Sequence, residues 1–376
     1  MQEAIAVESS STKNTSRIEI GPGVALLRNG SSDELQVQGQ TVVAVDGCAA
    51  GANAWSLTRI SAAPGVTHEQ LCLALYAALS RGRVERKTVV TMDAGALRPE
   101  LLQQLQATPA REPGKLAARI DVALSKLAQG FEPLLAVPAE LYVQEVADTV
   151  RAHVESAFSE GFFRSVADGR LSKQQYVYIL AQQHAYVRYT TRILGYCVAY
   201  SDDSALRKHF AKHLSEEVNH EKILEADLAY LGADVEYVVR DFEPNPATLQ
   251  FVLGELALVS HFHDPVLLTA APLVAEGISG HLGRAFIDRL EQLVRSWGHA
   301  EPERATRFFS SHIEYDGGDD GHFEGSMRML HPHLTSERLL RRYLAALHSL
   351  GQCFLRIYRE SMSETDIWSA GSARPQ

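Results

Sequence analysis

The stretch KHLSEEVNHEKILEADLAYLG, residues 212–232, decides the fold class because its apolar and ionisable residues follow one helical period. At about 100° per residue, Glu217 and His220 lie roughly 60° apart on one helix face. Leu224, Asp227 and Leu231 continue that face at steps of three and four residues, the spacing of a core-facing stripe. The pattern predicts a bundle helix whose buried face carries a Glu-x-x-His pair, an arrangement that holds metal ions in helix bundles.

Two alternatives apply to this pair. Glu216 stands four residues before His220 and can serve in place of Glu217, which is favoured because it lies in the stripe. A solvated Glu–His face without any metal is the other alternative.

The helical period extends over most of the chain. Apolar residues recur at three- and four-residue steps in segments around 140–165, 172–200, 204–231, 246–291, 301–314 and 335–362. Breaks at 168–170, 201–203, 232–246 and 331–334 divide these segments into some seven helices. We therefore expect residues 131–368 to form an all-α, bundle-like domain.

A lone carboxylate stands in the apolar stretch LLTAAPLVAEGISGHLG, residues 267–283. An ionised Glu276 in such surroundings must be paired or must bind a metal, because its desolvation costs several kcal/mol. His281 and the group HFHD, residues 261–264, are nearby candidates for partners. The alternative is a capping or ion-paired glutamate at a helix break near Gly277.

A third ionisable group lies in FFSSHIEYDGGDDGHFEGSMRML, residues 308–330. His312 and Asp316 are four residues apart and share a helix face, and His322 follows after a glycine-rich stretch. Imidazole and carboxylate donors suit iron or manganese better than they suit soft thiolate-binding metals. An acidic loop between helices is the alternative.

The N-terminal part has a different pattern. Residues 1–17 predict a disordered tail, and GVALLR, ELQVQ and TVVAV, separated by turn clusters, predict three short strands. A helix follows from an N-cap at Thr67 to Gly82, with apolar residues at helical spacing. We expect a small α+β domain over 18–104 and a linker over 105–130.

This order of strands and helix resembles the winged-helix recognition domains fused to enzymes that modify ribosomal peptides. The resemblance implies binding of a leader peptide as an added strand at a sheet edge. An accessory domain used for packing or dimerisation is the alternative.

Charge and cysteine content exclude other classes. Residues 1–130 carry 13 basic and 12 acidic groups, whereas the rest of the chain carries 23 and 34, together with 14 of the 15 histidines. The net charge of −10 argues against general binding of nucleic acid or anionic lipid. The four cysteines show no paired spacing, and no secretory signal or membrane-spanning run is found, which predicts a cytoplasmic protein.

The three ionisable segments occur in the order and spacing of the haem-oxygenase-like di-iron oxidases, which residues 140–362 resemble. The resemblance implies a seven-helix haem-oxygenase-like bundle that binds two Fe(II) ions, or manganese, per chain and reacts with O2. The implied metal ligands are Glu217, His220, Glu276, His312, Asp316 and His322. The last ligand of the family usually follows the aspartate by three or four residues, so Asp319 competes with His322 for this role. Residues expected to orient the ligands are Glu216, His184 and Asp227.

The resemblance leaves the substrate open, between a small molecule, an amino-acid derivative and a ribosomal peptide. An external electron donor and a homodimer are also compatible with it. The competing functions are a metal-free enzyme of the thiaminase-II or cofactorless-oxidase type, a haem-binding protein, and a non-enzymatic partner-binding protein. A thiaminase-type route needs a cysteine nucleophile in a pocket, and Cys197 has no evident base beside it in the sequence.

Overall fold

The structure is a computed structural model. It describes residues 15–21, 23–30, 32–51, 54–63, 66, 70–71, 73–78, 89–92, 138–316 and 322–362. The chain divides into two compact units. The sheet unit comprises Met1–Thr149 and His331–Arg341, and the helical unit comprises Val150–Leu330 and Arg342–Gln376. The segment 105–130, for which we predicted a linker, lies outside the described residues.

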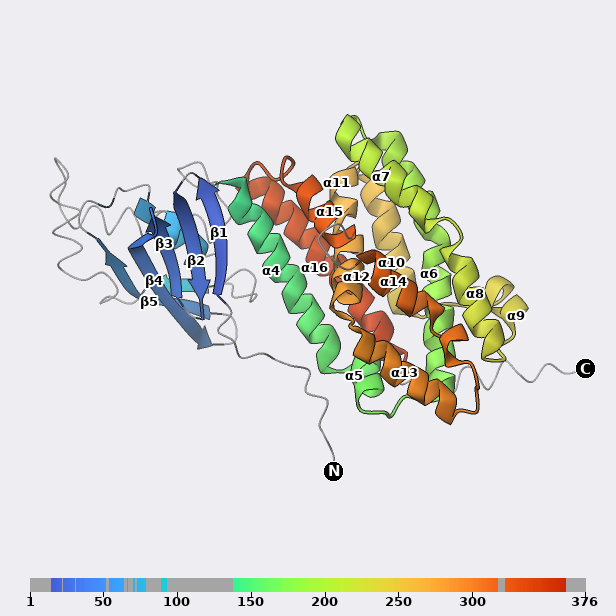
Figure 1. Ribbon diagram of the computed structural model, residues 1–376. Coiled ribbons are helices and arrows are strands. Elements are labelled where there is room, and N and C mark those ends of the chain that lie inside the picture. The colour runs from blue at the N-terminus through green and yellow to red at the C-terminus, as the bar shows by residue number, and fades with distance from the viewer. Residues whose placement is uncertain are drawn as a thin grey trace, which may run out of the picture. The chain divides into compact units, whose positions relative to one another are not determined.

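The sheet unit contains one six-stranded sheet in the order β1-β2-β3-β4-β5-β6. The first five strands are antiparallel neighbours, and β6 pairs parallel to β5 (Figure 1). The strands are β1 Thr15–Gly21, β2 Val24–Asn29, β3 Ser32–Val37, β4 Gln40–Gly51, β5 Ala54–Ala62 and β6 Val89–Met92. The three predicted strands overlap β2, β3 and β4. The other three strands were not predicted, because pairing with neighbours rather than a strong apolar pattern defines them.

The core of the sheet unit forms between the strands and the short helix expected after Thr67. Residues 70–71 and 73–78 are helical. Leu26 and Leu35 from the sheet and Leu71 from the helix are fully buried. Arg28 of β2 forms ion pairs with Asp33 and with Asp148 of helix α4 (Ala139–Ser159). The α+β character is as expected, while the winged-helix resemblance stays a prediction.

Helices make up the rest of the described chain, in agreement with the expected mainly α fold. A capping box starts α6, because the Ser172 side chain accepts a hydrogen bond from the Gln175 backbone and the Gln175 side chain accepts one from Ser172. After α4, the helices are α5 Gly161–Ala167, α6 Lys173–Tyr200, α7 Ser204–Glu217, α8 His220–Tyr230, α9 Val235–Arg240, α10 Pro246–Leu256, the π-helix η1 Ala257–His261, α11 Pro265–Leu268, α12 Ala270–His281, α13 Arg284–Ser296, the 3₁₀ helix η2 Pro302–Arg304, α14 Arg307–Asp316, α15 His322–Leu330 and α16 Glu337–Glu360.

Two predicted segments are interrupted by breaks that the periodicity did not reveal. The segment 204–231 splits into α7 and α8, with Asn219 between them in the left-handed conformation at φ 74°. Asparagine tolerates this conformation better than most residues, so a break can occur without glycine. The segment 246–291 splits into α10, η1, α11, α12 and part of α13, and Pro265 begins α11.

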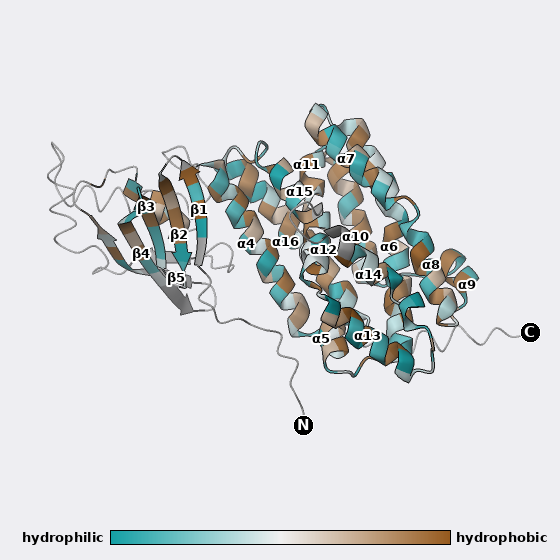
Figure 2. Ribbon diagram, in the orientation of Figure 1, coloured by the Kyte–Doolittle hydropathy of each residue, from teal (hydrophilic) through white to brown (hydrophobic). Residues whose placement is uncertain are grey.

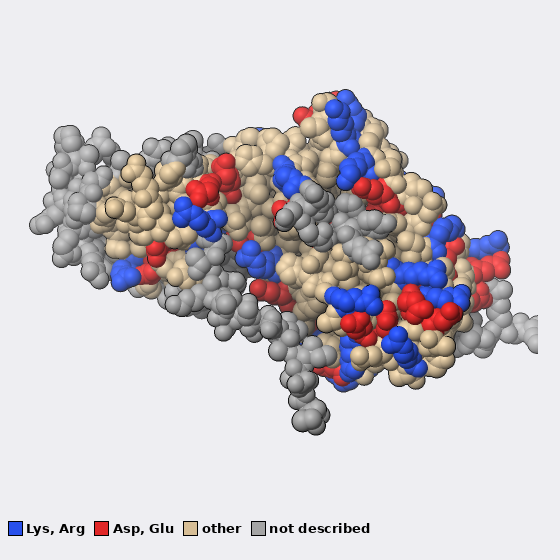
Figure 3. Space-filling view, viewed as in Figure 1, with Lys and Arg blue, Asp and Glu red and all other residues tan. Residues whose placement is uncertain are grey.

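The helical unit packs around α6, which contacts α7, α8 and α10. One apolar cluster joins Ile193 and Leu194 of α6 to Phe210 of α7 and Leu268 of α11. The helices show brown stripes beside teal ones in Figure 2, as expected for helices with one buried face. Acidic and basic side chains are interspersed over the face in Figure 3. Arg284 and Asp288 of α13, for example, form an exposed ion pair.

No single helix among the described residues has the length and apolar composition needed to cross a membrane. One pair of helices, Pro265–His281 and Arg284–Ser296, meets these criteria together, but it is bent by 80°.

Candidate metal centre

Helix α7 presents two ionisable side chains to the interior near its C-terminal end. His213 and Glu217 are separated by one helical turn, and their Nε2 and Oε1 atoms lie 3.5 Å apart. The side chain of Glu217 is only 11% exposed, whereas neighbouring Glu216 is 33% exposed and pairs with the surface residue Lys212. The structure thus places Glu217 on the interior face and Glu216 at the surface.

The break after α7 changes how Glu217 and His220 meet. We expected them on one continuous helix, but Glu217 ends α7 and His220 begins α8. Asn219, in the left-handed conformation, separates the two helices. The pair still forms, with 2.9 Å between His220 Nδ1 and Glu217 Oε2.

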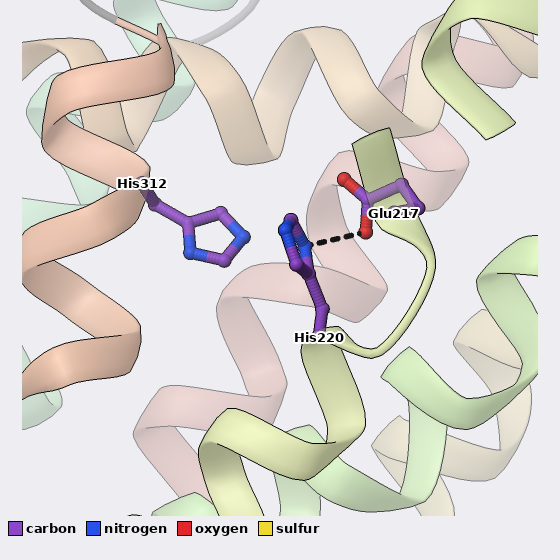
Figure 4. A group of neighbouring side chains, drawn as sticks. All are labelled: Glu217, His220 and His312. Atoms are coloured by element: carbon purple, nitrogen blue, oxygen red, sulfur yellow. Dashed lines mark ion pairs between the residues drawn. The ribbon is translucent and has the colours of Figure 1, made fainter. Parts of the chain in front are cut away.

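His312 of α14 approaches this pair from a separate part of the sequence. Its Nδ1 atom lies 2.7 Å from the Phe308 carbonyl oxygen one turn earlier, so Nδ1 donates to that carbonyl and Nε2 is the nitrogen that can accept a proton or a metal. The imidazole rings of His312 and His220 lie 4.9 Å apart between centroids. Figure 4 shows His220 between Glu217 and His312.

These three residues form a group that can hold a metal ion. One donor atom from each of Glu217, His220 and His312 lies within 4.8 Å of the other two. His220 is buried, and the other two residues are partly buried. Two imidazoles and a carboxylate, taken from α7, α8 and α14, provide nitrogen and oxygen ligands of the kind that iron, manganese and zinc accept.

Glu276 lies beside this group and is connected to it by His213. It is in the middle of α12 and only 5% exposed. His213 Nε2 lies 3.8 Å from Glu276 Oε1, and Ser326 Oγ donates a hydrogen bond of 3.3 Å to Glu276 Oε2. His213 therefore stands between two buried carboxylates, Glu217 and Glu276.

The helix that carries Glu276 continues without a break to His281, and the neighbouring Gly277 allows close packing. A Cβ atom on Gly277 would lie 2.7 Å from Val150 Cγ1. Of the partners considered for Glu276, His281 contacts the Gly277 carbonyl oxygen through Nδ1 at 2.6 Å, and Asp264 pairs with Arg342. The contacts described for the Glu276 carboxyl are therefore with His213 and Ser326, and Glu276 lies within a helix and does not cap one.

The histidines keep Glu217 ionised although it is buried. Burial alone would raise the pKa of Glu217, but hydrogen bonds and charge interactions with His213 and His220 outweigh burial and hold the pKa well below its usual value. Glu217 is therefore a carboxylate at neutral pH, the form required of a metal ligand.

A cavity opens next to the group and encloses about 940 Å³ of empty space, part of it continuous with solvent. His213, Glu217, Glu276 and His312 contribute to its wall. Most of the other lining residues are apolar, among them Phe251, Leu268, Phe308 and Phe354. The site thus combines convergent ionisable groups with room for a small ligand, as binding pockets commonly do.

The residues expected to orient the ligands have other contacts in the structure. Buried His184 of α6 lies 3.4 Å from Glu225 of α8, between Nε2 and Oε1. Asp227 accepts a hydrogen bond of 3.0 Å from the Phe308 backbone, so it caps the start of α14. Burial raises the pKa of Asp227 to about 7, although the Phe308 amide and Arg307 act in the opposite direction. Asp227 therefore positions α14, the helix that carries His312, through the hydrogen bond to the Phe308 backbone.

The remaining predicted ligands are placed only by their backbones. Asp316 is the last residue of α14, one turn after His312, and His322 is the first residue of α15. Asp319 lies outside the described residues. The side chains of Asp316 and His322 likewise lie outside the part of the chain that the structure describes, so their roles stay predictions.

Two residues of the site were not singled out from the sequence. His213 continues the stripe of Glu217 and His220 by one turn, so the period itself could have identified it. Glu255, near the end of α10, also lines the cavity. Its only sequence signal is a single carboxylate in the apolar run FVLGELALV, residues 251–259.

Comparisons with known proteins identify the fold. No protein-family model matches the sequence, and no curated protein matches it. A domain of unknown function with a haem-oxygenase-like fold from Shewanella denitrificans OS217 is 20% identical, with a TM-score of 0.52, over 62% of this chain and 98% of that chain. A TenA homologue from Pseudomonas syringae pv. tomato str. DC3000 is 14% identical, with a TM-score of 0.43, over 57% of this chain and 92% of that chain. The helical part of the protein therefore has a haem-oxygenase-like fold.

Proposed function

We propose that the protein is a non-haem, iron-dependent oxidase or oxygenase that uses O2. The observation that carries this proposal is the convergence of Glu217, His220 and His312, whose donor atoms lie within 4.8 Å of one another beside a cavity that Glu217 and His312 line. The full ligand set of the two proposed ferrous ions is Glu217, His220, Glu276, His312, Asp316 and His322.

The chemistry of the described donors fits iron. Glu217 is held ionised, the Phe308 carbonyl fixes the Nδ1 side of the His312 ring, and Glu276 lies next to His213 at the same cavity wall. Nitrogen and oxygen donors without thiolate are typical of non-haem iron sites. When bound, the iron ions would supply a binding position for O2 and the electrons for its reduction. An external donor would replace these electrons.

The protein's own residues fix the geometry and the surroundings of the reaction. The Phe308 carbonyl orients the His312 ring, and the Asp227 carboxyl of α8 holds the N-terminus of α14. These two contacts together fix the position of His312. Phe251, Phe308 and Phe354 limit the water in the cavity, which protects reactive species from side reactions.

The cysteine-dependent alternative has less support. Cys197 is completely buried in the apolar cluster of α6 and α7. Burial, followed by the nearby charge of Glu255, raises the pKa of its thiol far above the usual value, so the thiolate nucleophile is disfavoured. Cys197 is also absent from the described residues that line the cavity.

The proposed substrate is a biosynthetic intermediate, either a small molecule or a residue of a peptide. A peptide is supported by strand β1, an end strand of the sheet that pairs only with β2 among the described residues. Such an edge can accept an added strand. Substrate binding and turnover that are both unchanged after deletion of residues 1–125 would refute the peptide role of this unit.

Iron analysis tests the proposed function. Protein purified without oxygen and loaded with Fe(II) should contain two iron ions per chain and should give an absorbance transient on exposure to O2. Glu276→Ala should lower the iron content, while His331→Ala, at an exposed histidine paired with Glu140, should leave it unchanged. A Soret band, or protein that retains no iron, would refute the proposal.

A further inference from the structure

One carboxylate of the cavity has no role in the proposed metal centre. Glu255 is the second-to-last residue of α10, and the π-helix η1 begins directly after the end of α10. Short π-helical segments often occur at functional sites, because they redirect the side chains around them. Glu255 lines the same cavity as Glu217, Glu276 and His312.

Glu255 and the metal centre lie close to a common neighbour, Tyr186 of α6. Burial raises the pKa of Tyr186 most strongly, followed by its hydrogen-bonded neighbour Tyr358 and then by the charges of Glu255 and Glu217. Both carboxylates therefore lie near the same phenol. Tyr186 and Tyr358 both line the cavity together with Glu255.

The Glu255 carboxyl lacks a partner within the described chain. No hydrogen bond or ion pair to Glu255 is formed by any described residue, in contrast to Glu217 and Glu276. Burial is the sole cause that raises its pKa to about 8. A carboxyl group in an apolar site without a partner is costly, and proteins usually retain such a group for a purpose.

The charge of the cavity wall indicates which ligand this carboxyl suits. Three glutamates line the cavity, and no lysine or arginine is found among the described lining residues. Glu217 and Glu276 belong to the metal centre, so Glu255 is the carboxylate that remains for a ligand. A substrate anion would meet no lysine or arginine side chain here, whereas a cation would pair with Glu255.

We propose that Glu255 binds a cationic nitrogen of the substrate, as found in a primary amine, and thereby positions the adjoining carbon chain against the metal centre. The substrate class is an amine with an apolar chain, because Phe251, Ile193 and Leu194 line the cavity around it. This assignment rests on the proposed function, since it places the substrate of that reaction. Glu255 acts here as a specificity-determining residue, and pairing with the cation restores its ionised form.

Binding of three probes with the same carbon chain tests the assignment. Hexylammonium, 1-hexanol and hexanoate are titrated calorimetrically into the full-length protein, both metal-free and loaded with Fe(II) without oxygen. A charge-assisted hydrogen bond contributes enough for hexylammonium to bind at least about tenfold more tightly than 1-hexanol. Hexanoate should bind more weakly than both.

Two isosteric variants separate this proposal from the proposed function. Glu255→Gln should abolish the preference for hexylammonium in the Fe(II)-loaded protein and should leave the iron content unchanged. Glu217→Gln should have the reverse effect, with lower iron content and a retained preference. Glu243→Gln, at an exposed glutamate before α10, is the control that should change neither property.

The outcomes are distinguishable. Wild-type protein that binds hexylammonium no more tightly than 1-hexanol, or Glu255→Gln protein that keeps the preference, overturns the assignment of Glu255 even when two iron ions are bound. Absence of iron overturns the proposed function, while the probe preference of the metal-free protein still reports on Glu255. Glu255→Met provides a second variant of similar volume, and thermal unfolding shows that each variant is folded.

Discussion

The helical unit contains two buried histidine–glutamate groups of different character. One is the group of Glu217, His220 and His312, in which donors from three helices meet beside the cavity that Glu217 and His312 line. The other is the pair of His184 with Glu225, which Lys222 also contacts at 2.8 Å. His184 is 2% exposed and is absent from the described cavity lining.

The comparison shows that a buried histidine beside a carboxylate does not by itself bring three donor groups together. Burial lowers the pKa of His184, and the charge of Glu225 only partly compensates, so this pair stabilises the packing of α6 on α8. In the metal centre, by contrast, His213 and His220 keep Glu217 ionised while a third imidazole approaches from α14. Convergence of several donors at an open cavity distinguishes the two groups.

The largest expected effect comes from removing a donor of the metal centre. His312→Ala should lower the Fe(II) affinity by at least about 100-fold, because loss of a ligand exceeds the usual effect of losing a residue that orients one. His281→Ala is the matched control, since its Nδ1 also lies close to the carbonyl oxygen four residues earlier. Iron titration with a chromophoric chelator measures the affinity. Equal affinities of the two variants would remove His312 from the ligand set.

A smaller effect is expected from His213, which contacts both carboxylates of the centre. His213→Ala should reduce Fe(II) affinity by about 10- to 100-fold, the range typical of residues that orient metal ligands. The reason is that Glu217 and Glu276 lose the imidazole between them. The same chelator titration applies, and unchanged affinity would place His213 outside the working centre.

The pH dependence of stability should reveal Asp227, which anchors the helix of His312. Its pKa of about 7 lies above the usual value of an aspartate, so the folded state binds the proton more tightly than the unfolded state does. The stability contributed by the protonated carboxyl is present at low pH and decreases as the pH rises from about 4 to 7. Asp227→Asn should remove this decrease, which is on the order of a few kcal/mol.

Urea unfolding of the metal-free protein at several pH values measures this effect as the difference between the wild type and Asp227→Asn. As the pH rises, the free energy of unfolding of the wild type should fall relative to that of Asp227→Asn. The difference between the two proteins should become constant above the pKa of Asp227. Parallel stability profiles would contradict the assignment of a raised pKa to Asp227.

The smallest effect on metal binding is expected at the contrasting pair. His184→Ala should change Fe(II) affinity by less than about twofold, while the loss of its hydrogen bond lowers the free energy of unfolding by about 1–3 kcal/mol. Chelator titration and urea unfolding of the same preparation separate the two quantities. A large loss of iron affinity would mean that the two groups are coupled, and the comparison would then fail.

Much of the site could be predicted from the sequence because helical periodicity is local. The stripe through Glu217, His220 and Asp227 indicates a buried ionisable face, and the residue types around Glu276 and His312 indicate the same chemistry. The structure brings four of the predicted ligands to one region: Glu217, His220, Glu276 and His312.

The break between α7 and α8 could not be predicted from the same pattern. Val218 and Asn219 fit the helical period as well as their neighbours do, and propensity disfavours them only slightly. Asn219 adopts the left-handed conformation because contacts of α7 and α8 with α6 determine where both helices lie. Tertiary packing often overrides a weak local preference in this way.

By itself the sequence determined most of the helical segments, their apolar faces and the ionisable groups that lie on them, because these properties repeat within a few residues. Only the tertiary structure decided that His184 pairs with Glu225, that His213 stands between Glu217 and Glu276, and that Glu255 lines the cavity. Side-chain direction relative to distant helices depends on how those helices pack, and the spacing along one helix carries no record of the helices that it will meet.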